Sequence, residues 1–142
     1  MIKASIIIAL VCTAGIMLYA LINRNNKTRL YEIAKEREPF NLNAFKAAAK
    51  LNFVSDELIS AVIKHLLIFV KISDFAFYAD DDLRHLLKIS NIEIKDLLTD
   101  VCLELNLVQP LIEDIKKYES RKGKLTSVGD LIRFMDYWGK KG

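Results

Sequence analysis

The feature that most constrains this chain is an uncharged, mainly apolar run of 19 residues at positions 4–22. As an α-helix rising about 1.5 Å per residue, the run is roughly 28 Å long, close to the hydrocarbon thickness of a bilayer. A cleaved signal peptide has a shorter apolar region, about 7 to 15 residues, before a small-residue cleavage site. A lipoprotein signal fits poorly, because Cys12 follows Ala-Leu-Val and ten mainly apolar residues come after it. We therefore predict that residues 1–23 are an uncleaved transmembrane anchor.

The charges that flank this run predict its orientation. Only Lys3 and the terminal amine precede it, whereas five basic residues follow within about 15 positions: Arg24, Lys27, Arg29, Lys35 and Arg37. Basic residues accumulate on the cytoplasmic side of single spans. We expect a single-pass protein of the bacterial inner membrane whose C-terminal domain lies in the cytoplasm.

The composition of the remaining chain favours helices. The 142 residues include only five glycines and two prolines, too few for the many turns of a small all-β domain. The net charge of +3 is small and scattered, which argues against nucleic acid as a partner. The two cysteines, Cys12 and Cys102, lie in very different settings and predict no disulfide framework.

Residues 24–54 are predicted to be a helix-prone juxtamembrane linker. Residues 28–38 have apolar side chains at helical spacing, and Pro39 ends that helix. Asn41 or Asn43 can cap a second, short helix. A soluble domain at residues 55–142 then opens with a helix at Ser55, followed by an aromatic loop at residues 73–80 and a short helical turn after Asp82.

The clearest predicted helix begins after Ser90. Ser90 and Glu93 have the spacing of a capping box, in which each side chain satisfies a free amide of the other residue. One face is apolar, with Ile94, Leu97, Leu98, Val101 and Leu105. An acidic stripe lies beside it, formed by Glu93, Asp96, Asp100 and Glu104. A last helix opens at residues 126–130 and directs these side chains inward: Val128, Leu131, Ile132, Met135 and Trp138. The predicted fold class is all-α.

No residue pattern predicts an enzyme. His65 and His85 lack a carboxylate or cysteine at ligand spacing, and no HExxH, CxxC or glycine-rich phosphate loop occurs. The three acids at residues 80–82 are consecutive, which suits helix capping better than a cation site. Cys102 lies beside an apolar stripe and is predicted to be a buried thiol. We expect no metal, no cofactor and no catalysis.

Two segments carry a resemblance to a known family. LTSVGDLIRF looks like the segment that opens the last helix of acyl carrier proteins, and DDDLRHLLKISNIEIKDLLTDVCLELNL resembles their loop and recognition helix. Over residues 55–138 the chain is similar to a bacterial side branch of that family, known as a domain of unknown function. The resemblance implies a small helical bundle. The serine that carries phosphopantetheine in the family corresponds to Asn91, whose amide cannot form the phosphodiester. Ser90 would be modified only if the register slipped by one residue, and its capping role explains it without that chemistry.

The functional expectation that follows from the resemblance concerns the acidic stripe. Residues 80–104 hold seven acidic and three basic side chains, a local net charge of −4. Such a face is either simply solvated or docks a basic patch of a partner, as the resemblance implies. We predict a membrane-anchored, non-catalytic docking protein with partner-binding residues Glu93, Asp96, Asp100 and Glu104. A membrane-anchored immunity protein that neutralises a toxin is the alternative. A third possibility is an assembly factor that acts through the span itself.

Overall fold

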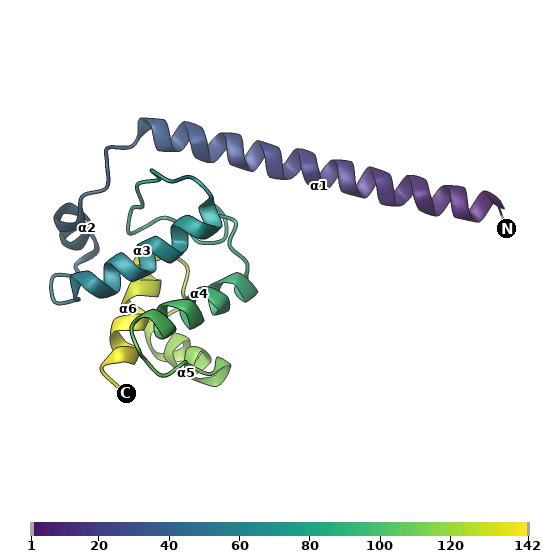
Figure 1. Cartoon of the computed structure of the whole chain (residues 1–142). Coiled ribbons are helices and arrows are strands. Elements are labelled where there is room, and N and C mark those ends of the chain that lie inside the picture. Colours follow the sequence, from purple (N-terminus) through teal and green to yellow (C-terminus); the bar gives the residue numbers. More distant parts are fainter. Residues whose placement is uncertain (1, 142) are drawn as a thin grey trace. The chain divides into compact units, whose positions relative to one another are not determined.

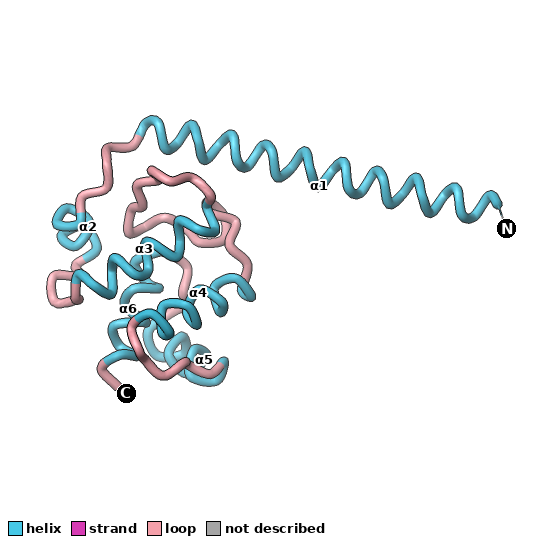
Figure 2. Tube along the Cα trace, in the orientation of Figure 1, coloured by secondary structure: helices cyan, strands magenta, loops and turns pink. Residues whose placement is uncertain are grey.

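The computed structural model describes residues 2–141, apart from the side chains at positions 2–6 and 9. Six α-helices and no β-strand form its regular secondary structure over that range. Figure 2 shows the helices in cyan and the connecting loops in pink. The helices are α1 (Ile2–Glu36), α2 (Leu42–Ala49), α3 (Asp56–Val70), α4 (Asn91–Glu104), α5 (Ile112–Lys122) and α6 (Val128–Gly139) (Figure 1). The all-α prediction is confirmed. The chain divides into two compact units, Met1–Arg37 and Glu38–Gly142.

The first unit is the single helix α1. It is 35 residues long, which corresponds to about 52 Å. The apolar run and residues 28–36 are therefore one continuous helix, which ends at Glu36, whereas the sequence predicted that the helix would continue to residue 38. Ten described large apolar side chains between Ile7 and Ile22 are each at least 55% exposed.

The predicted membrane span is not supported by the structure. Among the residues searched, those described in full, no helix is both long enough and apolar enough to cross a bilayer. Met1 and the side chains at positions 2–6 and 9, which belong to the predicted anchor at residues 1–23, lie outside the described part.

Helix α2 belongs to the second unit, although the sequence placed it in a linker. Asn41 caps α2 by accepting a hydrogen bond from the Ala44 amide at 3.0 Å. Phe45 and Ala49 are buried, and Lys46 forms a 2.6 Å ion pair with Asp56 at the start of α3. The folded domain therefore begins near residue 38 rather than residue 55, because α2 contributes side chains to its core.

Helix α3 is the centre of this domain. It packs against both α4 and α6, and Figure 1 shows α4 alongside it. The helix opens at Ser55 as the sequence predicts, and the Ser55 hydroxyl caps it by accepting from the Leu58 amide at 3.2 Å. The largest completely buried side chains come from all three helices and from the loop between α3 and α4: Ile59, Val62, Leu66, Phe77, Leu83, Leu97, Leu98, Val101, Leu131, Ile132, Phe134 and Met135.

The loop between α3 and α4 is fastened to the start of α6. Three backbone hydrogen bonds join them: Gly129 N to Ala79 O at 2.8 Å, Val128 N to Asp81 O at 3.1 Å, and Leu83 N to Thr126 O at 2.9 Å. We call this contact the α6 seam. The predicted aromatic loop at residues 73–80 buries Phe75 and Phe77 in the core, with 3% and 1% of their surface exposed.

Helix α5 was not predicted from the sequence, where no helix was placed between Leu105 and residue 126. No side chain of α5 is fully buried. It is held by aromatic contacts instead, with the ring of Tyr118 5.1 Å from that of Phe134 and 5.2 Å from that of Tyr137. Trp138, which was predicted to point inward, is half-buried, and its indole N–H donates to Val108 O at 2.6 Å.

We predict that Gly129→Ala destabilises the domain by about 1–3 kcal/mol, the usual cost of overpacking. A Cβ atom at position 129 would lie 2.9 Å from the carbonyl oxygen of Ala79, so the α6 seam would have to open. The measurement is urea unfolding followed by the fluorescence of Trp138, the single tryptophan. Gly139→Ala is the matched control, because its Cβ would meet Leu107 at an ordinary 3.6 Å. Equal stability of the two variants would contradict the role given to the seam.

Candidate functional site

The predicted partner-binding residues all lie on α4, and the fold uses two of them. At the N-terminus, Ser90 Oγ accepts from the Glu93 amide at 3.3 Å, and Glu93 Oε2 accepts from the Ser90 amide at 2.7 Å. The predicted capping box is confirmed. The hydrogen bond from the Ser90 amide, with help from the Ser90 hydroxyl, lowers the pKa of Glu93. Glu93 is thus an ionised structural cap.

Glu104, at the other end of α4, ties this helix to α3. Its Oε2 lies 2.9 Å from Lys64 Nζ and 2.8 Å from His65 Nε2. Hydrogen bonds from Lys64 and then His65 lower the pKa of Glu104. In the described part of the chain, His65 Nδ1 is buried without a hydrogen-bond partner. The geometry therefore favours the tautomer with its proton on Nε2, because a proton on Nδ1 would leave a buried donor unsatisfied.

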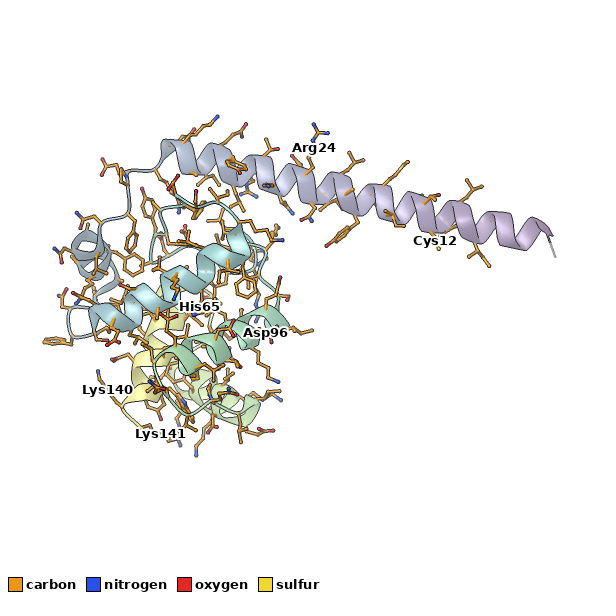
Figure 3. The ribbon with its side chains drawn as sticks, viewed as in Figure 1. Cys12, Arg24, His65, Asp96, Lys140 and Lys141 are labelled. Carbon is orange, nitrogen blue, oxygen red and sulfur yellow. The ribbon has the colours of Figure 1, made fainter. Side chains whose placement is uncertain are left out.

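Asp96 and Asp100 differ from the other two acids. Both are exposed, and within the described chain neither carboxylate forms an ion pair or a side-chain hydrogen bond. Figure 3 labels Asp96 on α4. They are four residues apart and therefore neighbours on one helix face.

Two exposed apolar side chains that were not predicted as part of a site share that face. Ile92 is 74% exposed and Leu103 is 63% exposed. With Asp96 and Asp100 they are spaced at four, four and three residues along α4, which places them in one row about 16 Å long. We call this row the α4 strip. The signal was present in the sequence, since Ile92 and Leu103 fall outside the buried stripe of α4.

The buried stripe of α4 agrees closely with the prediction. Ile94, Leu97, Leu98 and Val101 are buried, whereas Leu105 is only half-buried and Cys102 takes its place in the core. Burial raises the pKa of the Cys102 thiol, which keeps it protonated.

The acids at residues 80–82 do not gather around one point. Asp82 Oδ1 accepts from the amides of Arg84 and His85, at 2.8 and 2.6 Å, and caps a hydrogen-bonded turn as predicted. Asp81 is buried and accepts from the Tyr78 amide at 2.8 Å, while Asp80 is exposed. Within the described residues no group of three potential ligands is placed to hold a metal ion.

Ser90 and Asn91 are where the resemblance would place a prosthetic group. Asn91 is exposed and begins α4, and the Ser90 hydroxyl serves as the cap described above. Asn91 also lines a hollow of about 460 Å³ between α4 and α5, together with Ile92, Lys95 and Ile115.

Comparison of the chain with known protein families, curated proteins and solved structures finds no significant match.

We predict that Ser90→Ala lowers stability by about 1 kcal/mol, the usual value of an N-cap, and raises the pKa of Glu93. Because folding lowers that pKa below its ordinary value of 4.5, Glu93 stabilises the fold above about pH 4.5 and loses this effect as the pH falls through the folded-state value. The variant should therefore lose less stability than the wild type on acidification through that range.

The measurements are unfolding curves recorded from pH 7 down to about pH 3, which covers the pH range in which Glu93 is protonated. The carboxyl chemical shift of Glu93 is followed over the same range. Ser120→Ala is the control, because the Ser120 hydroxyl only donates to the Lys117 carbonyl within α5. Equal stability of Ser90→Ala and Ser120→Ala would contradict the capping role of the Ser90 hydroxyl, since the Ser90 amide that bonds Glu93 is present in both variants.

Proposed function

We propose that this chain is a non-catalytic docking protein that binds a partner protein through the α4 strip. Its domain is acyl-carrier-like, and its N-terminal helix tethers it to the bacterial inner membrane with the domain in the cytoplasm. The partner presents a basic patch with apolar pockets beside it. This proposal modifies the residue set from the sequence: Asp96 and Asp100 carry the contact, whereas Glu93 and Glu104 support the helix.

The α4 strip is the observation that carries the proposal. Unpaired carboxylates on a surface stay hydrated and carry no desolvation penalty. Charge complementarity with a partner raises the encounter rate and selects against wrong partners. Ile92 and Leu103 are large, apolar and more than 60% exposed at the two ends of the strip. Apolar anchors next to charges are the usual composition of a small docking face.

The acyl-carrier-like interpretation is supported by the residues that begin α4 and α6. Asn91 begins α4, the position that the resemblance gives to the start of the recognition helix, and Ser127 and Asp130 open α6 with a capping box. The amide of Asn91 cannot form a phosphodiester, and the Ser90 hydroxyl accepts a hydrogen bond as a cap. We therefore propose docking without a covalent acyl arm.

The membrane tether is supported by the sequence and by the exposure of α1. A helix whose apolar side chains are exposed on all sides requires cover from lipid or from other protein. The apolar run at residues 4–22 has the length of a hydrocarbon core, and basic residues follow it. These features favour lipid as the cover.

We predict that charge reversal in the α4 strip abolishes partner contact. A photo-crosslinking amino acid at Thr99, which lies beside the strip, should trap a discrete partner in cells expressing the full chain. Asp96→Lys with Asp100→Lys should remove that adduct, because two attractive charges become repulsive. The affinity for the purified partner should fall by more than tenfold and should depend less on salt.

The control makes the same charge change elsewhere. Glu57 and Glu113 are exposed at the starts of α3 and α5, and the described chain shows no ion pair for either. Glu57→Lys with Glu113→Lys should leave the adduct intact. If both double variants keep it, or if both lose it, the α4 strip is not the docking face. A trapped toxin would favour the immunity alternative.

We predict that a phosphatase active only outside the cytoplasm is inactive when fused after Gly142, because the basic residues after the apolar run retain the domain inside. A fusion of a cytoplasm-active reporter at the same point should be active. The full chain should also remain in the membrane fraction after a carbonate wash, whereas a chain with Ile8→Lys and Leu18→Lys should not. Strong phosphatase activity would contradict the cytoplasmic assignment without affecting the α4 strip.

A further inference from the structure

A second hollow, on another part of the folded domain, is not used by the docking proposal. Its volume is about 460 Å³, and all its lining residues belong to the second unit. They come from the segment before α2, from α2 itself and from the loop at residues 76–80. The hollow is therefore formed on one side by a helix and on the other by the loop that the α6 seam holds.

The lining of this hollow combines aromatic rings, alanine methyl groups and carboxylates. Four of the lining residues are aromatic, four are alanines, and two carry carboxylates: Phe40, Phe45, Phe77 and Tyr78; Ala44, Ala48, Ala76 and Ala79; Glu38 and Asp80. Pro39 and Asn41 complete the set, and no lysine, arginine or histidine is among the lining residues described. Methyl groups in place of larger side chains leave the space open between the rings.

The aromatic walls are held in place by the fold. Phe45 and Phe77 are 5% and 1% exposed and form the inner part, while Phe40 and Tyr78 are 38% and 46% exposed and lie at the surface. The rings of Phe40 and Phe45 are 5.5 Å apart, and Phe77 makes an edge contact with Phe75 at 5.0 Å. A ligand in the hollow therefore meets mainly the exposed rings of Phe40 and Tyr78, with the buried rings of Phe45 and Phe77 behind them.

We propose that this hollow binds a small organic ammonium ion. Aromatic faces attract cations through the ring quadrupole, and quaternary ammonium groups are bound in this way by cages of aromatic side chains. Glu38 and Asp80 are exposed carboxylates that add attraction for a positive charge and repel an anion. An alkylammonium combines an apolar surface for the alanines and rings with a charge for the two acids.

A neutral apolar ligand would use the same rings and methyl groups but not the carboxylates. The discriminating pair of probes is choline and its uncharged carbon isostere, 3,3-dimethylbutan-1-ol. The two have nearly the same shape and differ in the charge of the central atom. The ammonium proposal requires that choline binds at least about tenfold more tightly, which corresponds to the larger cation–π energies.

The experiment uses the full chain in maltoside micelles, with its alanine methyl groups labelled with carbon-13. Choline should shift the methyl resonances of Ala44, Ala48, Ala76 and Ala79, and the choline N-methyl protons should move upfield because they lie near aromatic rings. The methyl group of Ala61, which is buried in α3 outside the hollow, is the internal reference. A titration with each probe gives the two affinities.

Substitutions then separate the two components of the site. Glu38→Gln with Asp80→Asn should weaken choline binding about threefold to tenfold and leave the isostere unchanged. Phe40→Leu keeps an apolar side chain but removes a ring, and should weaken choline about threefold. The controls are Glu57→Gln and Phe53→Leu, because Glu57 is exposed on α3 and Phe53 is 95% exposed in the turn before it. Both controls should bind choline normally.

A free amine and a lipid headgroup offer the same ammonium chemistry, so vesicles distinguish the sources. Phosphatidylcholine vesicles that shift the four alanine methyl groups when phosphatidylglycerol vesicles do not would identify a headgroup as the ligand. Shifts with free choline alone would identify a soluble amine. Equal affinities for choline and its isostere would overturn the proposal, as would a complete absence of methyl shifts with choline and with both kinds of vesicle. These outcomes are independent of partner binding at α4.

Discussion

The α6 seam is the contact on which the rest of the folded domain depends. Three backbone hydrogen bonds fasten a loop of about 20 residues to the first turn of α6, and Gly129 permits the close approach. Asp130 stabilises this turn by accepting hydrogen bonds from Thr126 and Ser127 and a 3.0 Å contact from Arg133. Burial alone would raise the pKa of Asp130, but the hydrogen bonds from Ser127 and Thr126 outweigh it and lower that pKa. The ionised carboxylate of Asp130 thus stabilises the turn to which the loop is bonded. That loop leads into α4, and its residues 76–80 form one wall of the aromatic hollow.

Helix α4 combines two roles that a count of charges does not separate. Its terminal acids work within the domain, since Glu93 completes the N-cap and Glu104 bridges to Lys64 and His65 on α3. Its middle acids, Asp96 and Asp100, lie in a row with Ile92 and Leu103 and face solvent. Two of the four acids in the stripe therefore have structural roles, and the other two are free to contact a partner. Exposed apolar side chains flank this second pair, a composition that suits a protein partner.

Local signals explain which elements were predictable. The caps at Ser55 and Ser90 and the opening of α6 depend on residues within three or four positions of one another, so the sequence contains the whole interaction. Helix α5 was missed because it has no fully buried side chain and depends on Tyr118 meeting rings of α6. The inclusion of α2 in the folded domain was missed for a related reason, since it depends on contacts between residues that are distant in the sequence. Lys46 pairs with Asp56, and Arg133 donates to Ala49 O at 2.9 Å across 84 residues.

The sequence by itself determined the helical class, the caps and the buried stripe of α4, because each follows from short-range periodicity and hydrogen bonding. It also determined that no familiar catalytic or metal motif is present. Only the tertiary structure decided which acids of α4 remain unpaired, since that depends on where Lys64 and His65 lie on another helix. It likewise brought Phe40 and Phe45 to the same hollow as Phe77 and Tyr78, more than 30 positions later in the chain. Long-range packing sets such neighbours, and no local pattern in the sequence records it.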